Sequence, residues 1–176
     1  MTAYRDRLLR AIKLDPELYE EVEADKTANN QAILTVLLAS LAAGVGGALS
    51  GGWYGLLLHT TVALVGWVVW AFLSYFIGTR LLPEPQTQAD MGELLRCTGF
   101  SSAPGLLQVL GFLPGLGGFI RFAVAIWMLA AFVVAVRQAL DYSSTLRAVG
   151  VCLIGWFVLM ALNVILFLVS LGRFTL

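Results

Sequence analysis

A serine beside a glycine and the chain's single histidine are the first residues to test for chemistry, because a serine nucleophile needs a base. Gly99, Phe100 and Ser101 match the start of a nucleophile-elbow motif, but Ala103 stands where that motif has its second glycine. The apolar segments of the chain place Ser101 and His59 near opposite faces of a hydrocarbon core about 30 Å thick. A nucleophile and its base must lie within about 3 Å of each other. We therefore predict no serine–histidine pair and no catalytic residue.

Other residue types that carry chemistry are sparse. The two cysteines, Cys97 and Cys152, are too few for a disulfide framework or a four-cysteine zinc site. An intramembrane aspartyl site needs two aspartates at membrane depth, whereas Asp90 and Asp141 fall in polar loops. The acidic residues near the N-terminus lack the spacing of a calcium loop, and no glycine-rich phosphate loop is present. We expect no metal, no cofactor and no enzymatic activity.

Composition places the chain in a membrane class. Of its 176 residues, 59% are hydrophobic and 12% are charged, whereas soluble domains are about 45–50% apolar and about 25% charged. The formal net charge is zero, so there is no basic excess to pair with nucleic-acid phosphates. These values exclude a disordered chain, a soluble globular domain and a nucleic-acid binder. They predict a multi-pass protein whose main partner is the lipid bilayer.

Five apolar segments can cross a bilayer, since a helical span needs about 20 residues. No charged residue lies between residues 27 and 79, and the later charges fall between apolar blocks. The sequence therefore predicts an all-α, polytopic membrane helical bundle, with a cytoplasmic tail at residues 1–30 and a five-span domain at residues 31–176. The predicted spans are residues 31–49, 54–77, 99–113, 119–136 and 148–171.

The third segment is the shortest and contains Pro104, so a re-entrant loop is an alternative to a full crossing. In that alternative the chain would turn back at mid-membrane and leave Arg121 near the bilayer centre, where a charge is costly. We therefore favour five spans. Residues 90–97 are predicted to form a short interfacial helix before this segment, and residues 114–118 a turn after it.

The distribution of basic residues predicts the orientation. With five spans, nine of the eleven Lys and Arg residues fall on one side of the membrane, and only Arg121 and Arg173 fall on the other. Basic residues are enriched in cytoplasmic segments. We expect a cytoplasmic N-terminus and an external C-terminus, in the cell or inner membrane if the protein is prokaryotic.

The tail carries its two signs of charge in separate halves. Residues 1–13 predict a basic amphipathic helix that lies on an anionic membrane surface or packs on the rest of the tail. Asp15 and Pro16 suit the N-cap and first position of a second helix. This acidic half is a solvated face, folds back on the basic half, or binds a basic cytoplasmic partner. Its candidate partner-binding residues are Asp15, Glu17, Tyr19, Glu20, Glu21, Glu23 and Asp25.

Small and amide residues are the expected packing contacts within the membrane, where close approach and hydrogen bonds replace the hydrophobic effect. Two amides, Gln108 and Asn163, fall at membrane depth and are predicted to bond to neighbouring helices. A smooth helix face could serve packing within the chain or a homo-oligomer. Its candidate residues are Ser40, Gly44, Gly47, Ala48 and Gly51.

Several segments together resemble the YIP family of Ypt-interacting membrane proteins, and in particular its prokaryotic branch. The similar segments are residues 14–25, 78–85, 103–107, 114–118 and 136–142. The resemblance implies a cytosolic tail, five closely packed spans and no catalytic residues. Eukaryotic relatives bind Rab-type GTPases and act in vesicle trafficking. The short tail of this chain departs from them, because it lacks their tail signature, to which residues 17–20 bear only a faint similarity.

Two functional hypotheses follow from these features. The two-signed tail and the spans without ionisable interiors favour a non-enzymatic membrane organiser or adaptor, whose tail recruits a partner. The alternative is a facilitator of lipid or small-solute movement. It rests on the short third segment, because backbone groups freed near Pro104 could line a cavity beside Gln108.

Overall fold

The computed structural model describes the backbone of residues 4–47 and 52–173. Within these ranges it describes all side chains except those of residues 46–47, 52–53, 55, 58–59 and 162–173. Every regular element in the described ranges is a helix, so the prediction of an all-α fold is confirmed. His59, Asn163 and Arg173 fall among the residues whose side chains lie outside this description.

Two short helices and one 3₁₀ turn form the tail. They are α1 (Tyr4–Ile12), α2 (Pro16–Ala24) and η1 (Lys26–Ala28). α1 ends in a Schellman motif, in which the Asp15 N–H donates to the Arg10 carbonyl and Leu14 adopts φ = 60°. Asp15 then caps α2 by accepting a hydrogen bond from the Glu17 N–H, as its position before Pro16 predicted.

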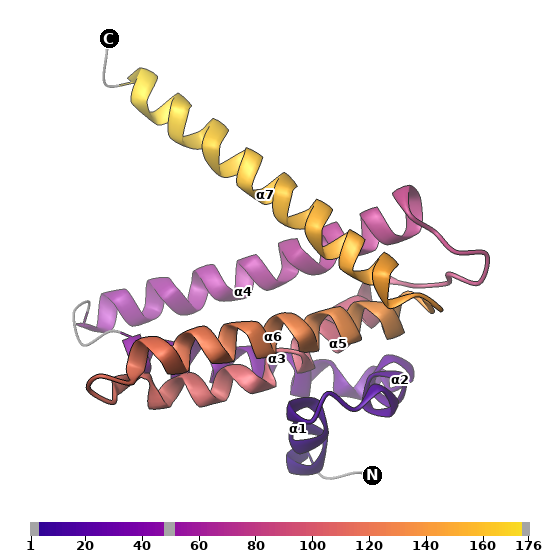
Figure 1. Cartoon of the computed structure of the whole chain (residues 1–176), viewed down its shortest axis with the longest axis horizontal. Coiled ribbons are helices and arrows are strands. Elements are labelled where there is room, and N and C mark those ends of the chain that lie inside the picture. The colour runs from indigo at the N-terminus through magenta and orange to yellow at the C-terminus, as the bar shows by residue number, and fades with distance from the viewer. Residues whose placement is uncertain (1–3, 48–51, 174–176) are drawn as a thin grey trace.

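The long helices form the bundle, and the last of them crosses the others and extends away at an angle (Figure 1). They are α3 (Asn29–Gly47), α4 (Gly52–Phe76), α6 (Gly117–Ala139) and α7 (Thr145–Arg173), and α4 continues into a π-helix, η2 (Ile77–Leu81). Three stretches are long and apolar enough to cross a membrane, namely Lys26–Val45, Thr60–Leu81 and Gly117–Ala139. Within the described side chains of α7, Thr145–Ala161 is a shorter apolar helix. The prediction of five spans stays a prediction.

The third apolar segment follows a short helix, as predicted. The helix expected at residues 90–97 forms as α5 (Met91–Phe100), and the apolar segment continues from it as a 3₁₀ helix, η3 (Ala103–Phe112), whose full crossing stays a prediction. Most side chains of α5 pack inside the bundle. Its start is set by a capping box between Asp90 and Glu93.

Close approach to α3 holds this third segment in place. A Cβ atom on Gly99 would lie 2.7 Å from the Ala32 Cβ, and one on Gly105 would lie 3.1 Å from the Ala39 Cβ. The later glycine contacts the later alanine of α3, so α5 and η3 run parallel to α3. Figure 1 shows η3 reaching the end of the bundle at which α6 begins.

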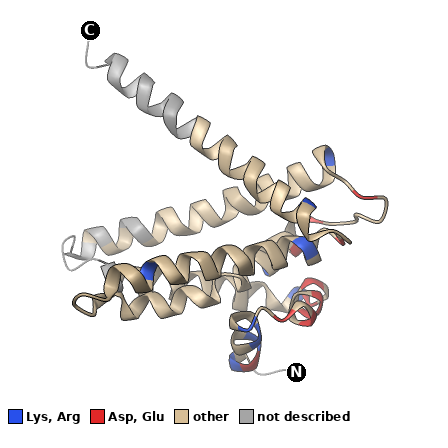
Figure 2. Ribbon diagram, viewed as in Figure 1, with Lys and Arg blue, Asp and Glu red and all other residues tan. Residues whose placement is uncertain are grey.

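Charge divides the bundle into two ends. Figure 2 shows that the acidic and basic residues gather around the tail, the end of α4, the start of α7 and the end of α6. We call this the charged end. Arg121 lies near the start of α6, at the opposite end, which we call the far end.

The tail belongs to the same core as the bundle. Leu18, Tyr19 and Val22 on α2 are fully buried, and α2 contacts both α5 and α6. They join a cluster that includes Phe100 of α5 and Val136 of α6. The tail is therefore packed onto the bundle at its charged end.

Candidate functional site

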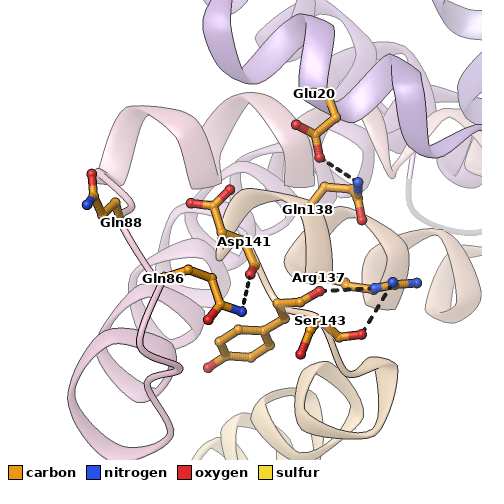
Figure 3. Close-up of a pocket in the computed structure, with 8 residues that line it drawn as sticks. Glu20, Gln86, Gln88, Arg137, Gln138, Asp141 and Ser143 are labelled. Atoms are coloured by element: carbon orange, nitrogen blue, oxygen red, sulfur yellow. Dashed lines mark hydrogen bonds between the residues drawn. The ribbon is translucent and has the colours of Figure 1, made fainter.

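A polar cavity opens at the charged end, where the tail meets two connecting segments. Its volume is about 530 Å³, and Figure 3 shows the side chains around it. α2, the loop at residues 82–90 and the end of α6 with its connection to α7 contribute the lining. The lining residues are Glu20, Gln86, Gln88, Arg137, Gln138, Asp141, Tyr142 and Ser143. We call it the charged-end pocket.

A helix-ending motif carries Asp141 to the pocket. The Tyr142 N–H donates to the Arg137 carbonyl and the Asp141 N–H donates to the Gln138 carbonyl, which makes a Schellman motif at the end of α6. Asp141 occupies its left-handed position, with φ = 53°. An aspartate tolerates this conformation better than most residues. Its exposed carboxylate lies on the same side of the pocket as Glu20 (Figure 3).

Side chains of the α6–α7 connection hold the 82–90 loop. The Tyr142 hydroxyl donates to the carbonyl oxygens of Gly78 and Leu82, at 3.0 and 2.7 Å. Burial raises the pKa of Tyr142 to about 12, so the hydroxyl keeps its proton. A Cβ atom on Gly78 would lie 2.4 Å from Leu140 Cδ1, so the two segments pack without a gap. Residues 78–85 and 136–142, two of the segments that resemble the YIP family, therefore meet here.

Glu84 is the central acceptor of this connection. Its carboxylate accepts hydrogen bonds from the N–H and the hydroxyl of Ser143, at 2.9 and 2.7 Å. Arg147 forms an ion pair with it at 3.3 Å, and Gln86 donates to it at 2.6 Å. The hydrogen bonds from Ser143 are the main reason why the pKa of Glu84 lies below its ordinary value. The sequence analysis did not single out Glu84 or Ser143, although Glu84 lies in one of the family-like segments.

Two side chains, those of Gln138 and Arg96, hold α2 beside the pocket. The Gln138 amide donates to the Glu20 carboxylate at 2.6 Å. Arg96, which is 3% exposed, donates to the Val22 carbonyl at 2.8 Å and also to the Glu23 carbonyl. A cation at the C-terminal end of a helix satisfies its last carbonyls and its dipole. The sequence indicated Arg96 only as one of nine basic residues on the predicted cytoplasmic side of the membrane.

Glu23 carries a partly buried carboxylate at the charged end. Its Oε2 atom is buried and has no hydrogen-bond partner among the described residues. Desolvation raises its pKa to about 8, the carboxylates of Asp141, Glu20 and Glu93 add to the shift, and Arg96 opposes it. Glu23 is therefore mostly protonated at neutral pH.

The basic and acidic halves of the tail fold back on each other. Arg7, which is 6% exposed, pairs with Glu21 and Asp25 at 2.8 Å and donates to Gln31 at 2.9 Å. Arg10 pairs with Asp15 at 2.7 Å and with Glu21 at 2.5 Å. Hydrogen bonds from Thr27 and Arg7 lower the pKa of Asp25 to about 2. This is one of the three arrangements that the sequence allowed.

The fold therefore separates the seven candidate partner-binding residues of the tail. Glu17 and Glu20 are exposed, and only Glu20 lines the pocket. Tyr19 is fully buried, and its pKa is raised by that burial. Asp15, Glu21 and Asp25 form the ion pairs with Arg7 and Arg10, and Glu23 is partly buried.

The candidate packing residues lie at the α3–α4 contact and inside the bundle. Gly44 is buried, and a Cβ atom there would lie 2.7 Å from Leu56 Cδ1 on α4. Ser40 is buried and donates to the Leu37 carbonyl. Gln108 donates to Met128 Sδ at 3.4 Å. The structure does not describe the side chains at the other predicted positions, Gly47, Ala48, Gly51 and Asn163.

The residues considered for catalysis have structural contacts. Ser101 is 3% exposed and donates to the Thr98 carbonyl at 2.7 Å. Cys97 and Cys152 are both buried as free cysteines. Across the part of the chain that the structure describes, no group of three or more His, Cys, Asp or Glu side chains is placed to hold a metal ion.

Comparison with known proteins gives one match. A family model described as the Yip1 domain matches residues 14–166. The match begins just before α2 and extends into α7, so it includes the whole charged-end pocket. No curated protein and no solved structure matches the chain.

Proposed function

This chain belongs to the Yip1 domain family, and we propose that within it the protein is a non-enzymatic membrane adaptor. Its apolar helices make it an integral membrane protein. The charged end faces the cytoplasm and docks a basic segment of a cytoplasmic partner. The observation that carries this proposal is the charged-end pocket, into which α2 and both neighbouring connections place polar side chains.

The chemistry of the pocket favours a cationic side chain. Glu20 and Asp141 bring two carboxylates to its lining against one guanidinium, that of Arg137, which already donates to the Tyr142 and Ser143 carbonyls, and Gln86, Gln88 and Gln138 bring amides. An arginine or lysine side chain that enters would gain charge-assisted hydrogen bonds, which are stronger than neutral ones. The volume of about 530 Å³ is large enough for one such side chain and its neighbours.

The proposed orientation rests on the basic residues around the pocket. The charged end holds Arg80 in η2, Arg137 in the last turn of α6, Arg147 near the start of α7 and Arg96, which contacts α2 of the tail. Arg121 lies near the start of α6, at the far end. Cytoplasmic segments near spans are enriched in Lys and Arg. This supports a cytoplasmic N-terminus and places the pocket where a cytoplasmic partner can reach it.

Affinity purification from native membranes tests the adaptor role. Removal of the tail is an unsuitable variant, because Leu18, Tyr19 and Val22 belong to the core. The double variant Glu20→Gln, Asp141→Asn instead neutralises the pocket, and Glu17→Gln is the matched control on an exposed site outside it. We expect a partner that co-purifies with the wild type and with Glu17→Gln but is lost from the double variant. If all three forms recover the same proteins, the pocket does not recruit a partner.

Movement of a lipid or small solute is the second candidate function. It is favoured by a groove within the bundle, lined by residues of α3, α4, η3 and α6 and having a volume of about 800 Å³. Flux or lipid exchange in proteoliposomes tests it directly. Rates equal to those of empty vesicles would exclude this candidate and leave the adaptor proposal untouched.

A further inference from the structure

The groove within the bundle has two chemically different walls. Trp67 and Trp70 of α4, with Phe132 of α6, form an apolar wall. Ser40, Ser102 and Gln108 supply polar atoms from α3 and the third segment. A groove that only accommodated neighbouring hydrocarbon would gain nothing from such polar atoms, which are costly to expose to lipid.

Gln108 is the residue of the polar wall whose protein partner is weak. Its amide nitrogen donates to Met128 Sδ at 3.4 Å, and a thioether sulfur is a weak acceptor. The amide is half-buried and lines the groove. An occupant with ester or hydroxyl oxygens would satisfy it better.

Arg121 brings a positive charge to the far-end part of the groove. It lines the groove, is exposed, and donates to the Gly111 carbonyl at 3.4 Å. An arginine at this level matches a phosphate, because its planar fork of N–H groups complements phosphate oxygens. The charge therefore complements an anionic headgroup rather than a neutral hydrocarbon.

The length of the groove fits one lipid leaflet. At about 1.5 Å per residue, Trp70 lies roughly 9 Å along α4 from its end at Phe76, and Arg121 lies roughly 27 Å along α6 from its end at Ala139. The groove thus extends over roughly 18 Å of depth, close to one leaflet of a core that is about 30 Å thick.

We propose that this groove binds one phospholipid, with its phosphate at Arg121 and one acyl chain along Trp67 and Trp70. The glycerol and ester oxygens then lie at the level of Gln108. The inference goes beyond the adaptor role and does not depend on it. It names a ligand for the groove on which the second candidate function rests, and it holds whether or not the lipid crosses the bilayer.

Gly66 allows the groove to be filled without a clash. It lines the groove, and a Cβ atom built there meets no atom within 4 Å. Gly66→Leu therefore places an apolar side chain in the space assigned to the acyl chain. Gly118 offers a matched control, since its Cβ would also meet no atom within 4 Å but it does not line the groove.

Native mass spectrometry of the delipidated full-length protein, titrated with phosphatidylglycerol or with diacylglycerol, tests the assignment. We expect one retained phosphatidylglycerol per wild-type chain. Gly66→Leu should weaken binding of both lipids by about tenfold or more, whereas Gly118→Leu should weaken neither. Arg121→Gln should weaken phosphatidylglycerol by about tenfold and leave diacylglycerol unchanged, because only the former carries a phosphate.

Three results would overturn the proposal. The first is a wild-type protein that retains no stoichiometric phosphatidylglycerol. The second is equal lipid binding by Gly66→Leu and Gly118→Leu, and the third is an Arg121→Gln variant that treats both lipids alike. A wild-type dimer that Gly66→Leu converts to a monomer without a change in lipid binding would assign the groove to a second copy of the chain instead.

A measurement on the unaltered protein covers the case in which Gly66→Leu does not fold. Brominated phosphatidylglycerol quenches tryptophan fluorescence on contact, and Trp67 and Trp70 line the groove. We expect a component of the quenching in detergent to saturate at one lipid per chain. Trp127 and Trp156 are exposed outside the groove and contribute a quenching component that does not saturate. The absence of a component that saturates at one lipid per chain would overturn the proposal.

Discussion

At the charged end, side chains hold the connections between helices, whereas at the far end the turn before α6 is closed mainly by backbone hydrogen bonds, to which the Arg121 side chain adds one to the Gly111 carbonyl. Tyr142 and Glu84 tie the 82–90 loop to the α6–α7 connection, and Arg96 ties α2 to α5. The turn before α6 is instead closed by a hydrogen bond from the Gly117 N–H to the Leu113 carbonyl. Within it Gly115 has φ = 78°.

The comparison shows two ways to close a membrane bundle. Polar side chains can bridge distant segments at the charged end because many polar residues are available there, and the same groups present a recognisable surface. The described part of the far end has few charged side chains (Figure 2), and its turn depends on backbone contacts that leave no room for a Cβ at Gly117. We therefore expect charge substitutions and pH to change the stability of the charged end, and added side-chain atoms to change the stability of the far-end turn.

The largest expected effect is the loss of the buried cation that holds α2. Arg96→Ala leaves the Val22 and Glu23 carbonyls without their donor, and we expect a loss of about 2–4 kcal/mol in stability. Arg5→Ala, on an exposed site of α1, is the control. Thermal unfolding in detergent measures both. An Arg96→Ala variant as stable as Arg5→Ala would show that α2 is held without Arg96, by its apolar face and the contact between Gln138 and Glu20.

A single added methyl group should break the far-end turn. A Cβ atom on Gly117 would lie 2.1 Å from the Gly111 carbonyl oxygen, which belongs to the backbone and can move only with the chain. We expect Gly117→Ala to cost about 1–3 kcal/mol. Gly118→Ala, with no atom within 4 Å of its Cβ, should leave the melting temperature unchanged or raise it slightly. Equal melting temperatures for both variants would contradict the tight turn.

The pH dependence of stability should come from the charged end. Between about pH 4.5 and 8, Glu23 stays protonated in the folded state but ionises when unfolded, so its contribution to stability falls as the pH rises. Glu23→Gln should remove this slope and stabilise the protein by about 1–2 kcal/mol at pH 8, a value reduced for solvent screening because Glu23 is only partly buried. At pH 4 the variant and the wild type should be equally stable.

Unfolding temperatures measured from pH 4 to 9 test this profile, and Glu17→Gln on the exposed face of α2 is the control. Asp25 changes stability with pH in the opposite direction and in a lower pH range. Its pKa of about 2 stabilises the fold above about pH 4, and this contribution is lost as the pH falls through 2. A wild-type stability that stays flat from pH 5 to 8 would contradict the assignment of Glu23.

The smallest expected effect compares two left-handed residues at opposite ends. A Cβ atom on Gly115 would meet no atom within 4 Å, so Gly115→Ala tests only the left-handed backbone conformation of this residue. We expect a loss of about 1 kcal/mol in stability. Asp141 adopts the same conformation within a connection that Tyr142 and Glu84 hold, so Asp141→Gly should change stability by less than about 0.5 kcal/mol. Equal losses in melting temperature would remove the distinction between the two ends.

Local features of the structure were predictable from short stretches of sequence. The Asp15 cap, the turn at residues 114–118 and the apolar helices all depend on neighbouring residues or on composition. The helix before the third segment was also predicted, but its burial was not, because that burial depends on the contact of α5 with Ala32 of α3. No spacing within residues 90–113 indicates that contact.

The candidate site was predictable only in part, for the same reason. The acidic tail drew attention to Glu20, which lines the pocket, but also to Tyr19, which the core buries. Arg96, Glu84 and Ser143 were missed because each is defined by a partner far away in the chain. Two family-like segments, 78–85 and 136–142, were the available signal, and they meet at this site.

The sequence by itself determined that this is a helical membrane protein with its charges confined to short segments, because lipid tolerates neither unpaired backbone groups nor scattered charges. It also determined the family, through segments that the match over residues 14–166 includes. Only the tertiary structure decided which polar groups pair. It joined Arg7 to Asp25 within the tail, placed Arg96 on the carbonyls of α2, and left Gln108 and Arg121 along one groove. Such pairings depend on the three-dimensional path of the chain, which periodicity and composition do not specify.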